Sequence, residues 1–334
     1  MTRRGYVAIL LLALVGFCAL PGDGSAGTTI RVSTGAPEQH FITKQYIEWA
    51  KLVESNAKGE LQVQVYHSAQ LFRDNEVIKA VATGAIEAGC AFTMYLENQL
   101  VPAMKLFQMP FFFESSNEIL AVVRSDIGGA MRKTAEQKGV KLLGLAMFPS
   151  PQDTIVMSTK PIKVRDDVKG LVIRAVSPES SAMIKHWGAG PSFLTGAEVY
   201  MGLQRGTIHG AVNSVTTYVE RKLYEVAPHA VMLPVISVHT FIAMNKGVFD
   251  RLTPTQQKAV LDASAAIEGA TEAAAQKAFR QDMEEAKQKS KLHQPTAAEL
   301  AVWKEGSQAI WDELSKGQKE VADTLKGAAA ILKR

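Results

Sequence analysis

The sequence predicts an α/β protein built from two similar lobes with a cleft between them. The first observation is a repeated phrase: residues 77–92 read VIKAVATGAIEAGCAF, and residues 199–214 read VYMGLQRGTIHGAVNS. Gly84 matches Gly206 and Ile86 matches Ile208 at one constant offset. In each copy an apolar-periodic helix stops at a glycine, which readily takes a left-handed conformation, and a short apolar strand follows. Such helix–glycine–strand units are also common in any α/β protein.

The second observation is that strands and helices alternate over most of the chain, which is typical of α/β architecture. Alternating or continuous apolar runs predict the strands, and apolar residues at helical spacing predict the helices. The expected strands are residues 29–33, 61–65, 140–147, 154–158, 171–175 and 207–212. The expected helices are residues 42–53, 117–137, 178–187 and 196–204.

The third observation is that the alternation of strands and helices ends after Thr253, where two long helices are expected up to the end of the chain. Thr253 to Gln256 form a capping box with proline at the first helical position. The first helix continues to about Ser290, which is about 55 Å, so it could run across both lobes. Its Ala-rich stretch 263–275 could also be a coiled-coil surface. Because its charges do not follow that spacing, we expect it to pack on the protein itself, and we expect a monomer.

Residues 1–26 are expected to be a cleaved signal peptide rather than part of the fold. Arg3 and Arg4 precede the apolar stretch 6–20, which is short for a membrane span, and small residues end at Ala26. An uncleaved N-terminal anchor is the alternative. A signal peptide predicts an exported protein.

Composition excludes several classes of protein. The chain has 334 residues and a formal net charge of +4, without a long basic run, so we expect no nucleic-acid partner. After the signal segment no apolar stretch approaches the length of a membrane span. Cys90 would be the one cysteine left after processing, so the exported chain must be stable without an internal disulfide.

Catalysis has little support in the sequence, and we expect neither an enzyme nor a cofactor. The nucleophile elbow, the zinc helix, the phosphate-binding glycine loop and the cysteine pair are all missing. The histidines are too scattered to predict a metal site; they are residues 40, 67, 186, 209, 229, 239 and 293.

Two polar residues at strand ends stand out as ligand-binding candidates. Arg174 ends an apolar strand, where a charge is costly unless it is paired, and an arginine there can hold a carboxylate in a bidentate fork. A structural ion pair is the alternative. Asn213 ends the strand of the second repeat and could hold a hydroxyl or carboxylate oxygen, or simply lie in the following turn.

At these residues the chain resembles the solute receptors of tripartite ATP-independent periplasmic (TRAP) transporters, of the dicarboxylate-receptor type. The likeness covers about residues 29–280. Its motifs are Gln70-Leu71, Met109–Phe113, Lys160-Pro161-Ile162, Lys169–Arg174, Tyr200 with Leu203-Gln204 and Gly206, Asn213, and Lys222 with Tyr224-Glu225-Val226.

The resemblance implies a two-lobed periplasmic-binding-protein-like fold, type II-like, with a long helix bridging lobes that close by a hinge. It implies that Arg174 clamps a ligand carboxylate and that Asn213 helps to hold the ligand. It also implies that the protein resides in the periplasm and that integral membrane subunits perform the transport. We expect lobe 1 to comprise residues 27–150 and 239–278, and lobe 2 to comprise residues 151–238 and 279–334. Further ligand contacts are expected from Phe148, Gln152, Asp153, Asp74, Thr93 and His40.

The sequence departs from the family pattern around the expected ligand. Gln152-Asp153 stands where many members have a second arginine, and an acidic group there disfavours a second ligand carboxylate. Ala211-Val212 replaces two polar residues before Asn213, and Gly196 replaces a frequent aromatic residue and leaves space. We therefore expect a monocarboxylate with a polar or larger remainder rather than a C4-dicarboxylate.

The sequence is also compatible with three further functions. A receptor of an ATP-driven importer would share the fold class but serve a different membrane partner. A secreted hydrolase or isomerase would use the cleft for chemistry, and a sensor or scaffold protein could use the same receptor fold.

Overall fold

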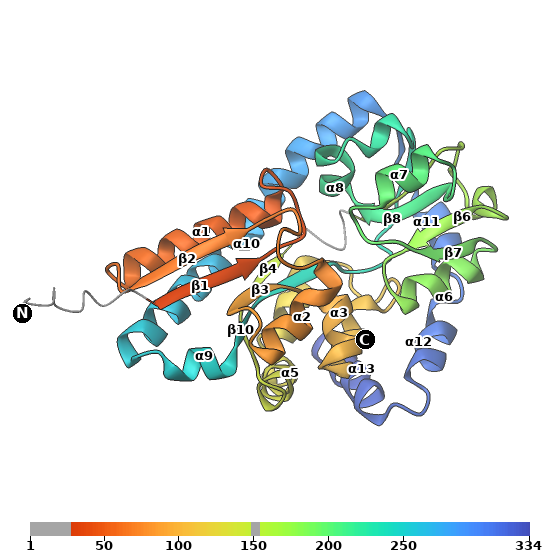
Figure 1. Cartoon of the computed structure of the whole chain (residues 1–334). Helices are drawn as coiled ribbons and strands as arrows, with labels where there is room; N and C mark the ends of the chain where they lie inside the picture. The colour runs from red at the N-terminus through yellow and green to blue at the C-terminus, as the bar shows by residue number, and fades with distance from the viewer. Residues whose placement is uncertain (1–27, 148–153) are drawn as a thin grey trace, which may run out of the picture.

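The computed structural model describes residues 28–147 and 154–334, so the expected signal peptide lies outside the described residues. Within them the chain forms two β-sheets flanked by helices (Figure 1). The first sheet has the order β2-β1-β3-β10-β4, from β1 (Thr28–Ser33), β2 (Leu61–Tyr66), β3 (Ala88–Phe92), β4 (Val140–Met147) and β10 (His239–Asn245). The second has the order β11-β9-β5-β8-β6-β7, from β5 (Thr154–Ser158), β6 (Val172–Ala175), β7 (Gly190–Phe193), β8 (Gly210–Ser214), β9 (His229–Met232) and β11 (Lys291–His293). The two-lobed α/β prediction is confirmed.

The chain crosses between the two sheets more than once, and the first two crossings lead to strands that pair antiparallel with their neighbours. After β4 it enters the second sheet as β5, which pairs antiparallel with β8 and β9. After β9 it returns through residues 233–238 as β10, which lies antiparallel between β3 and β4. The neighbours of β1 are parallel, as helical crossovers produce.

Helices cover both sheets, and their buried faces follow helical spacing. In α1 (Phe41–Asn56) the buried residues include Ile42, Tyr46, Trp49 and Val53. The other helices before the long C-terminal one are α2 (Asp74–Thr83), α3 (Thr93–Gln99), the 3₁₀ helix η1 (Pro102–Gln108), α4 (Ser116–Val123), α5 (Asp126–Gln137), η2 (Arg165–Val168), α6 (Pro178–His186), α7 (Val199–Gln204), α8 (Val215–Glu220), η3 (Leu223–Glu225) and α9 (Lys246–Arg251).

The repeated phrase has the predicted structure in both halves. Gly84 ends α2 with φ 76° and Gly206 follows α7 with φ 70°, so both glycines take the left-handed conformation that other residues avoid. The strands β3 and β8 then enter different sheets. The strand of the second copy lies later than predicted, at Gly210–Ser214, so Asn213 lies inside it.

A long helix, α10 (Pro254–Lys289), joins the two lobes (Figure 1). It packs on α1 and β4 of the first lobe and on α8 of the second. Trp49 of α1 donates from Nε1 to Ser264 Oγ of α10 at 2.9 Å. The capping box of Thr253 and Gln256 forms as predicted, and the bridging role of this helix is confirmed.

The prediction of one further long helix after α10 is wrong. Three shorter helices follow instead: α11 (Ala297–Lys304), α12 (Ser307–Ser315) and α13 (Lys319–Ile331). Gly306, at φ 82°, breaks the run between the first two. The predicted helix 117–137 is likewise two helices, because Ser125 caps a new one. The predicted lobe boundaries stay a prediction; α12 contacts α6, whereas α13 contacts η1, α4 and α5.

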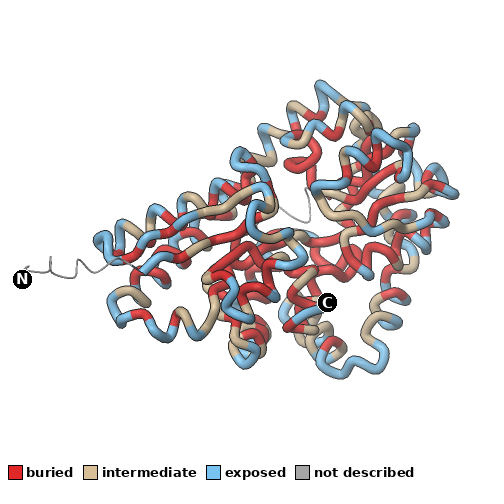
Figure 2. The backbone as a smooth tube through the Cα atoms, viewed as in Figure 1, coloured by how far each residue is buried: buried red, intermediate tan, exposed pale blue. Residues whose placement is uncertain are grey.

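Buried residues, coloured red in Figure 2, occur in both sheets and in the helices that flank them. Four apolar clusters make up this core, two around the first sheet and two around the second. In the described part of the chain no helix combines the length and the apolar character that a membrane crossing requires.

Candidate functional site

A cavity lies between the two lobes, where β3, β6 and β8 end. Its empty space is about 620 Å³, including the opening to solvent. The size is that of a pocket for a small organic molecule. The lining residues are Ala36, His40, Asp74, Phe92, Met94, Tyr95, Arg174, Val176, Gly196, Asn213, Ser214, Thr217, Arg221 and Val238.

Arg174 lies at the end of β6 and lines the cavity with a buried side chain. Two backbone carbonyls orient it: Nε donates to Leu194 O at 2.9 Å, and Nη1 donates to Val212 O at 3.2 Å. Burial lowers the pKa of Arg174 to about 10, and the charge of Arg221 also lowers it, so the side chain stays cationic at neutral pH. Within the described residues no carboxylate lies within the 4.0 Å of an ion pair with it. One N–H of Nη1 and both of Nη2 remain for a ligand.

Arg221, the residue after α8, is a second arginine of the cavity. A Cβ built on Gly196 would lie 3.6 Å from Nη1 and 3.7 Å from Nη2, so the guanidinium occupies the space beside that glycine. Burial lowers the pKa of Arg221, and the charges of Asp74 and Glu220 oppose this effect. In the described part of the chain its buried Nε has no hydrogen-bond partner.

Asp74 supplies the negative charge of the first lobe. It begins α2, and its Oδ1 accepts from the backbone N–H of Gly35 at 2.9 Å. A Cβ at Gly35 would lie 2.3 Å from that oxygen, so this close approach requires glycine. Burial raises the pKa of Asp74, while the Gly35 N–H and the charges of Arg221 and Arg174 lower it.

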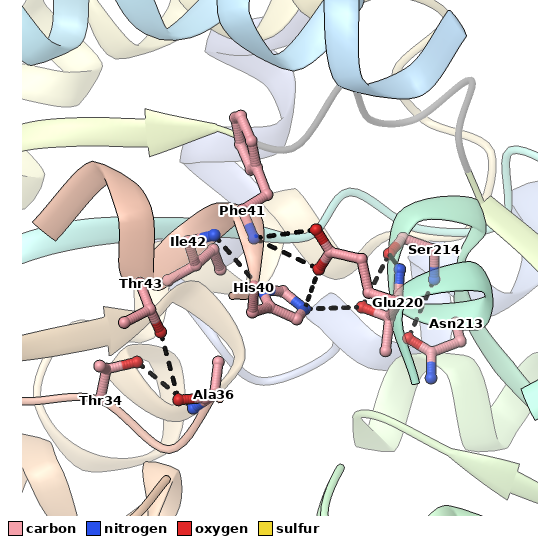
Figure 3. Close-up of polar contacts among 10 residues, drawn as sticks. Thr34, Ala36, His40, Phe41, Ile42, Thr43, Asn213, Ser214 and Glu220 are labelled. Atoms are coloured by element: carbon pink, nitrogen blue, oxygen red, sulfur yellow. Dashed lines mark hydrogen bonds and ion pairs between the residues drawn. The ribbon is translucent and has the colours of Figure 1, made fainter. Parts of the chain in front are cut away.

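His40 connects the two lobes at the edge of the cavity (Figure 3). Its Nδ1 accepts from Ile42 N at 3.3 Å and so caps α1, which places the imidazole proton on Nε2. Nε2 lies 3.3 Å from Thr217 Oγ1 and 3.5 Å from Glu220 Oε2, both on α8. Burial lowers the pKa of His40 to about 3, with Arg221 and Lys44 adding to the effect, so the ring is neutral.

Asn213 and Ser214 end β8 at the cavity wall. Asn213 Oδ1 accepts from Ser214 N at 3.0 Å, which fixes the amide and leaves Nδ2 as a donor. Ser214 Oγ accepts from Thr217 N at 3.0 Å and caps α8. The sequence after the strand therefore turns at once into a helix, and Asn213 lies where β8 meets it.

Apolar and aromatic side chains form the rest of the wall. Phe92 and Tyr95 pack edge to face, with ring centroids 6.2 Å apart. Burial raises the pKa of Tyr95, so its hydroxyl stays protonated and can donate a hydrogen bond. Met94 and Val176 add apolar surface. The cavity therefore offers fixed cationic donors beside an apolar wall, which is an arrangement for binding an acid rather than for transforming one.

The described residues contain no group of histidine, cysteine and acidic side chains placed to hold a metal ion. The cavity's polar groups thus come from two arginines, one aspartate, a neutral histidine and several hydroxyl and amide groups.

Comparison with known proteins supports the resemblance. A family model described as bacterial extracellular solute-binding protein, family 7, matches residues 32–318.

The chain belongs to this family. Members of this family are solute-binding proteins that act outside the cytoplasm. The 2,3-diketo-L-gulonate-binding periplasmic protein of Escherichia coli is 26% identical over 257 residues, covering 76% of each chain. The C4-dicarboxylate-binding periplasmic protein of Rhodobacter capsulatus is 26% identical over 294 residues, covering 85% of each chain.

The fold of a family 7 receptor is also found among solved structures. The sugar acid binding protein of Advenella mimigardefordensis, solved in complex with galactonate, has a TM-score of 0.84 and 19% sequence identity. The match covers 91% of this chain and 99% of that one. At this identity the likeness supports the fold alone.

The structure brings four of the eight predicted ligand residues of this family 7 protein to the cavity: Arg174, Asn213, Asp74 and His40. Thr93 lies behind the wall, fully buried; its hydroxyl donates to His239 O at 3.4 Å and accepts from Gln108 Nε2 at 3.2 Å. Phe148, Gln152 and Asp153 lie outside the described residues. Ligand contact by any of the eight residues stays a prediction.

Sequence reasoning missed Arg221 and Tyr95. Arg221 reads as an ordinary charge at a helix end, and Tyr95 reads as one apolar position of a short helix. A usable signal existed at Gly196, where the sequence indicated extra space; the structure shows that the Arg221 guanidinium lies beside it.

Proposed function

We propose that this family 7 protein is a periplasmic receptor for a small organic acid, namely a monocarboxylate with a polar or larger remainder. It captures the acid in the interlobe cavity and delivers it to the integral membrane subunits of a TRAP transporter. The predicted signal peptide, residues 1–26, would direct its export. The observation that carries this proposal is Arg174, which is buried, oriented by two carbonyls and without an ion pair to any described residue.

The geometry of Arg174 supports a carboxylate as its partner. The Leu194 carbonyl accepts the N–H of Nε, and the Val212 carbonyl accepts one N–H of Nη1. These two hydrogen bonds fix the plane of the guanidinium. The remaining N–H groups on Nη1 and Nη2 match the two oxygens of a carboxylate. A ligand carboxylate would also offset the cost of the buried charge.

The first experiment is a thermal-shift screen of the exported protein against monocarboxylates, sugar acids and C4-dicarboxylates, followed by titration calorimetry of the best acid. A ligand at about 100 times its Kd should stabilise the protein by roughly 2.7 kcal/mol. Arg174→Ala should weaken binding by a few kcal/mol while the unliganded protein stays folded. Arg174→Lys should bind the acid nearly as weakly as Arg174→Ala, because an ammonium group cannot reproduce the two-nitrogen contact of a guanidinium.

Two outcomes would contradict the proposal. If Arg174→Ala unfolds without ligand, the arginine has a structural role. If succinate binds with micromolar Kd and exceeds every monocarboxylate, the expected class of acid is wrong.

A further inference from the structure

We propose that Arg221 is a second solute-binding arginine, which holds a neutral oxygen of the acid's remainder while Arg174 holds the carboxylate. This inference rests on the proposed function and narrows it. The preferred solutes are then hydroxylated monocarboxylates, in which a hydroxyl or ring oxygen lies within reach of the second guanidinium.

The position of Arg221 is the first reason. Its guanidinium lies against Gly196 on the wall of the same cavity as Arg174, although the two arginines come from different elements. Because glycine has no side chain, nothing from residue 196 covers the Nη atoms. A Cβ there would be at ordinary contact distance, so a larger side chain would have to share this space with Arg221.

Its hydrogen bonding is the second reason. In residues 28–147 and 154–334 the buried Nε of Arg221 has no acceptor, and no carboxylate lies within 4.0 Å of the guanidinium. A guanidinium with a buried, unsatisfied donor costs stability. A bound solute that accepts hydrogen bonds from this guanidinium would offset that cost, which gives a reason for an arginine at this position.

The charges of the cavity decide which kind of oxygen Arg221 receives. By formal charge the described lining residues include two cations, Arg174 and Arg221, and one anion, Asp74, while burial lowers the pKa of His40 to about 3 and keeps that ring neutral. One solute carboxylate balances this set, whereas a dicarboxylate would leave an uncompensated negative charge in the cavity. Arg221 is therefore expected to donate to an uncharged oxygen, and Asp74 to accept from a solute hydroxyl.

The apo protein should respond to loss of Arg221 in a way that an ordinary structural residue would not. Removing a charge that has no ion pair in the described residues and that also repels Arg174 should leave the melting temperature unchanged or raise it. A residue that held α8 in place would instead lower the melting temperature when replaced.

The test compares wild type, Arg221→Met, Arg221→Lys and Arg174→Ala by calorimetric titration with D-galacturonate, D-glucuronate, D-galactonate and succinate. Arg205→Met is the matched control, because Arg205 also follows a short helix of the second lobe but is exposed. We expect Arg221→Met to raise the Kd of the best sugar acid at least tenfold and Arg221→Lys to recover part of that loss. The control should stay within threefold, and apo Arg221→Met should melt no lower than wild type.

The outcomes separate the two proposals. If Arg174→Ala abolishes sugar-acid binding but Arg221→Met binds within threefold of wild type, this inference is overturned and the proposed function stands. If wild type binds succinate in preference to the sugar acids, the neutral-oxygen assignment is overturned. If wild type binds none of these acids but binds another monocarboxylate in the thermal-shift screen, this inference is overturned and the proposed function stands. If it binds no acid in either experiment, both proposals fail.

Discussion

Arg174 and Arg221 differ from arginines that stabilise the fold, because Arg174 and the Nε atom of Arg221 are buried and no carboxylate of residues 28–147 or 154–334 lies within ion-pair distance of either guanidinium. Arg31, for comparison, lies 2.8 Å from Glu87 Oε1 in a two-nitrogen contact that joins neighbouring strands. Such pairs complete their hydrogen bonds within the protein. The two cavity arginines use few of their donors in the described part of the chain, which fits residues held ready for a ligand.

At the residue scale, we expect a buried histidine to lower the free energy of unfolding in acid. His239 is fully buried at the start of β10, and burial lowers its pKa from 6.5 to about 3. Between these values the unfolded chain binds a proton that the folded chain does not, so the free energy of unfolding falls as the pH falls. We expect His239→Gln to reduce this fall by on the order of 2–3 kcal/mol between pH 7 and pH 4. Urea denaturation at several pH values measures it, and parallel curves for the two proteins would contradict the prediction.

At the element scale, the beginning of α1 contacts side chains of α8 (Figure 3). Glu220 of α8 accepts from the backbone N–H of Phe41, at 3.1 Å to Oε1 and 3.2 Å to Oε2. This N–H belongs to the first turn of α1, where the amides have no intrahelical partners. An acidic group at a helix N-terminus also interacts favourably with the helix dipole. A carboxylate of the second lobe therefore caps a helix of the first.

This contact is sensitive to pH in the opposite direction to His239. Burial raises the pKa of Glu220 from 4.5 to about 7; Asp282 also raises it, while Phe41, Lys44 and Arg221 lower it. Over that range the folded chain holds the extra proton, so the free energy of unfolding falls as the pH rises.

Replacing Glu220 by glutamine removes this titration. Relative to wild type, Glu220→Gln should therefore gain on the order of 2 kcal/mol in unfolding free energy between pH 5 and pH 8. Urea denaturation at both pH values measures the difference. Glu284→Gln is the control, because Glu284 is exposed on α10 and pairs with Lys287 of the same helix. A constant difference between Glu220→Gln and wild type would contradict the prediction.

A second contact of the lobes joins α3 and η1 to α6. Lys105 Nζ lies 3.6 Å from Oε1 of the fully buried Glu179. Burial and the neighbouring Glu179 raise the pKa of Glu97 well above its usual range. The two lobes thus also meet through the contact of η1 with α6.

At the scale of the whole molecule, we expect the two lobes to move about a hinge. The segment 233–238 joins β9 to β10, the chain also crosses between β4 and β5, and α10 spans both lobes (Figure 1). A solute that contacts Asp74 on one lobe and Arg174 on the other favours the closed arrangement by its differential affinity.

Solution scattering tests this motion. We expect a smaller radius of gyration for the protein saturated with its best acid than for the unliganded protein. Arg174→Ala at the same acid concentration should scatter like the unliganded protein, which separates closure from a general effect of the acid. Identical curves for free and saturated wild type would show that binding does not work by closure.

Much of the fold follows from local patterns in the sequence. The alternation of Leu61, Val63 and Val65 with polar residues predicted β2, and the capping box at Thr253 predicted the start of α10. Helix ends inside apolar-periodic segments were harder, because the pattern continues across Ser125 although a new helix begins there. The prediction of one long helix after α10 failed for a similar reason, because the left-handed Gly306 separates α11 from α12.

By itself, the sequence determined the α/β class, the two matching helix–glycine–strand units and the placement of Arg174 and Asn213 at strand ends. These depend on residues close together in the chain, so their spacing carries the information. The tertiary structure alone decided that Arg221 lies beside Gly196, that Tyr95 lines the cavity and that Glu220 caps α1. Each of these contacts joins elements far apart in sequence, and only the packing of two lobes against each other determines which side chains face a shared space.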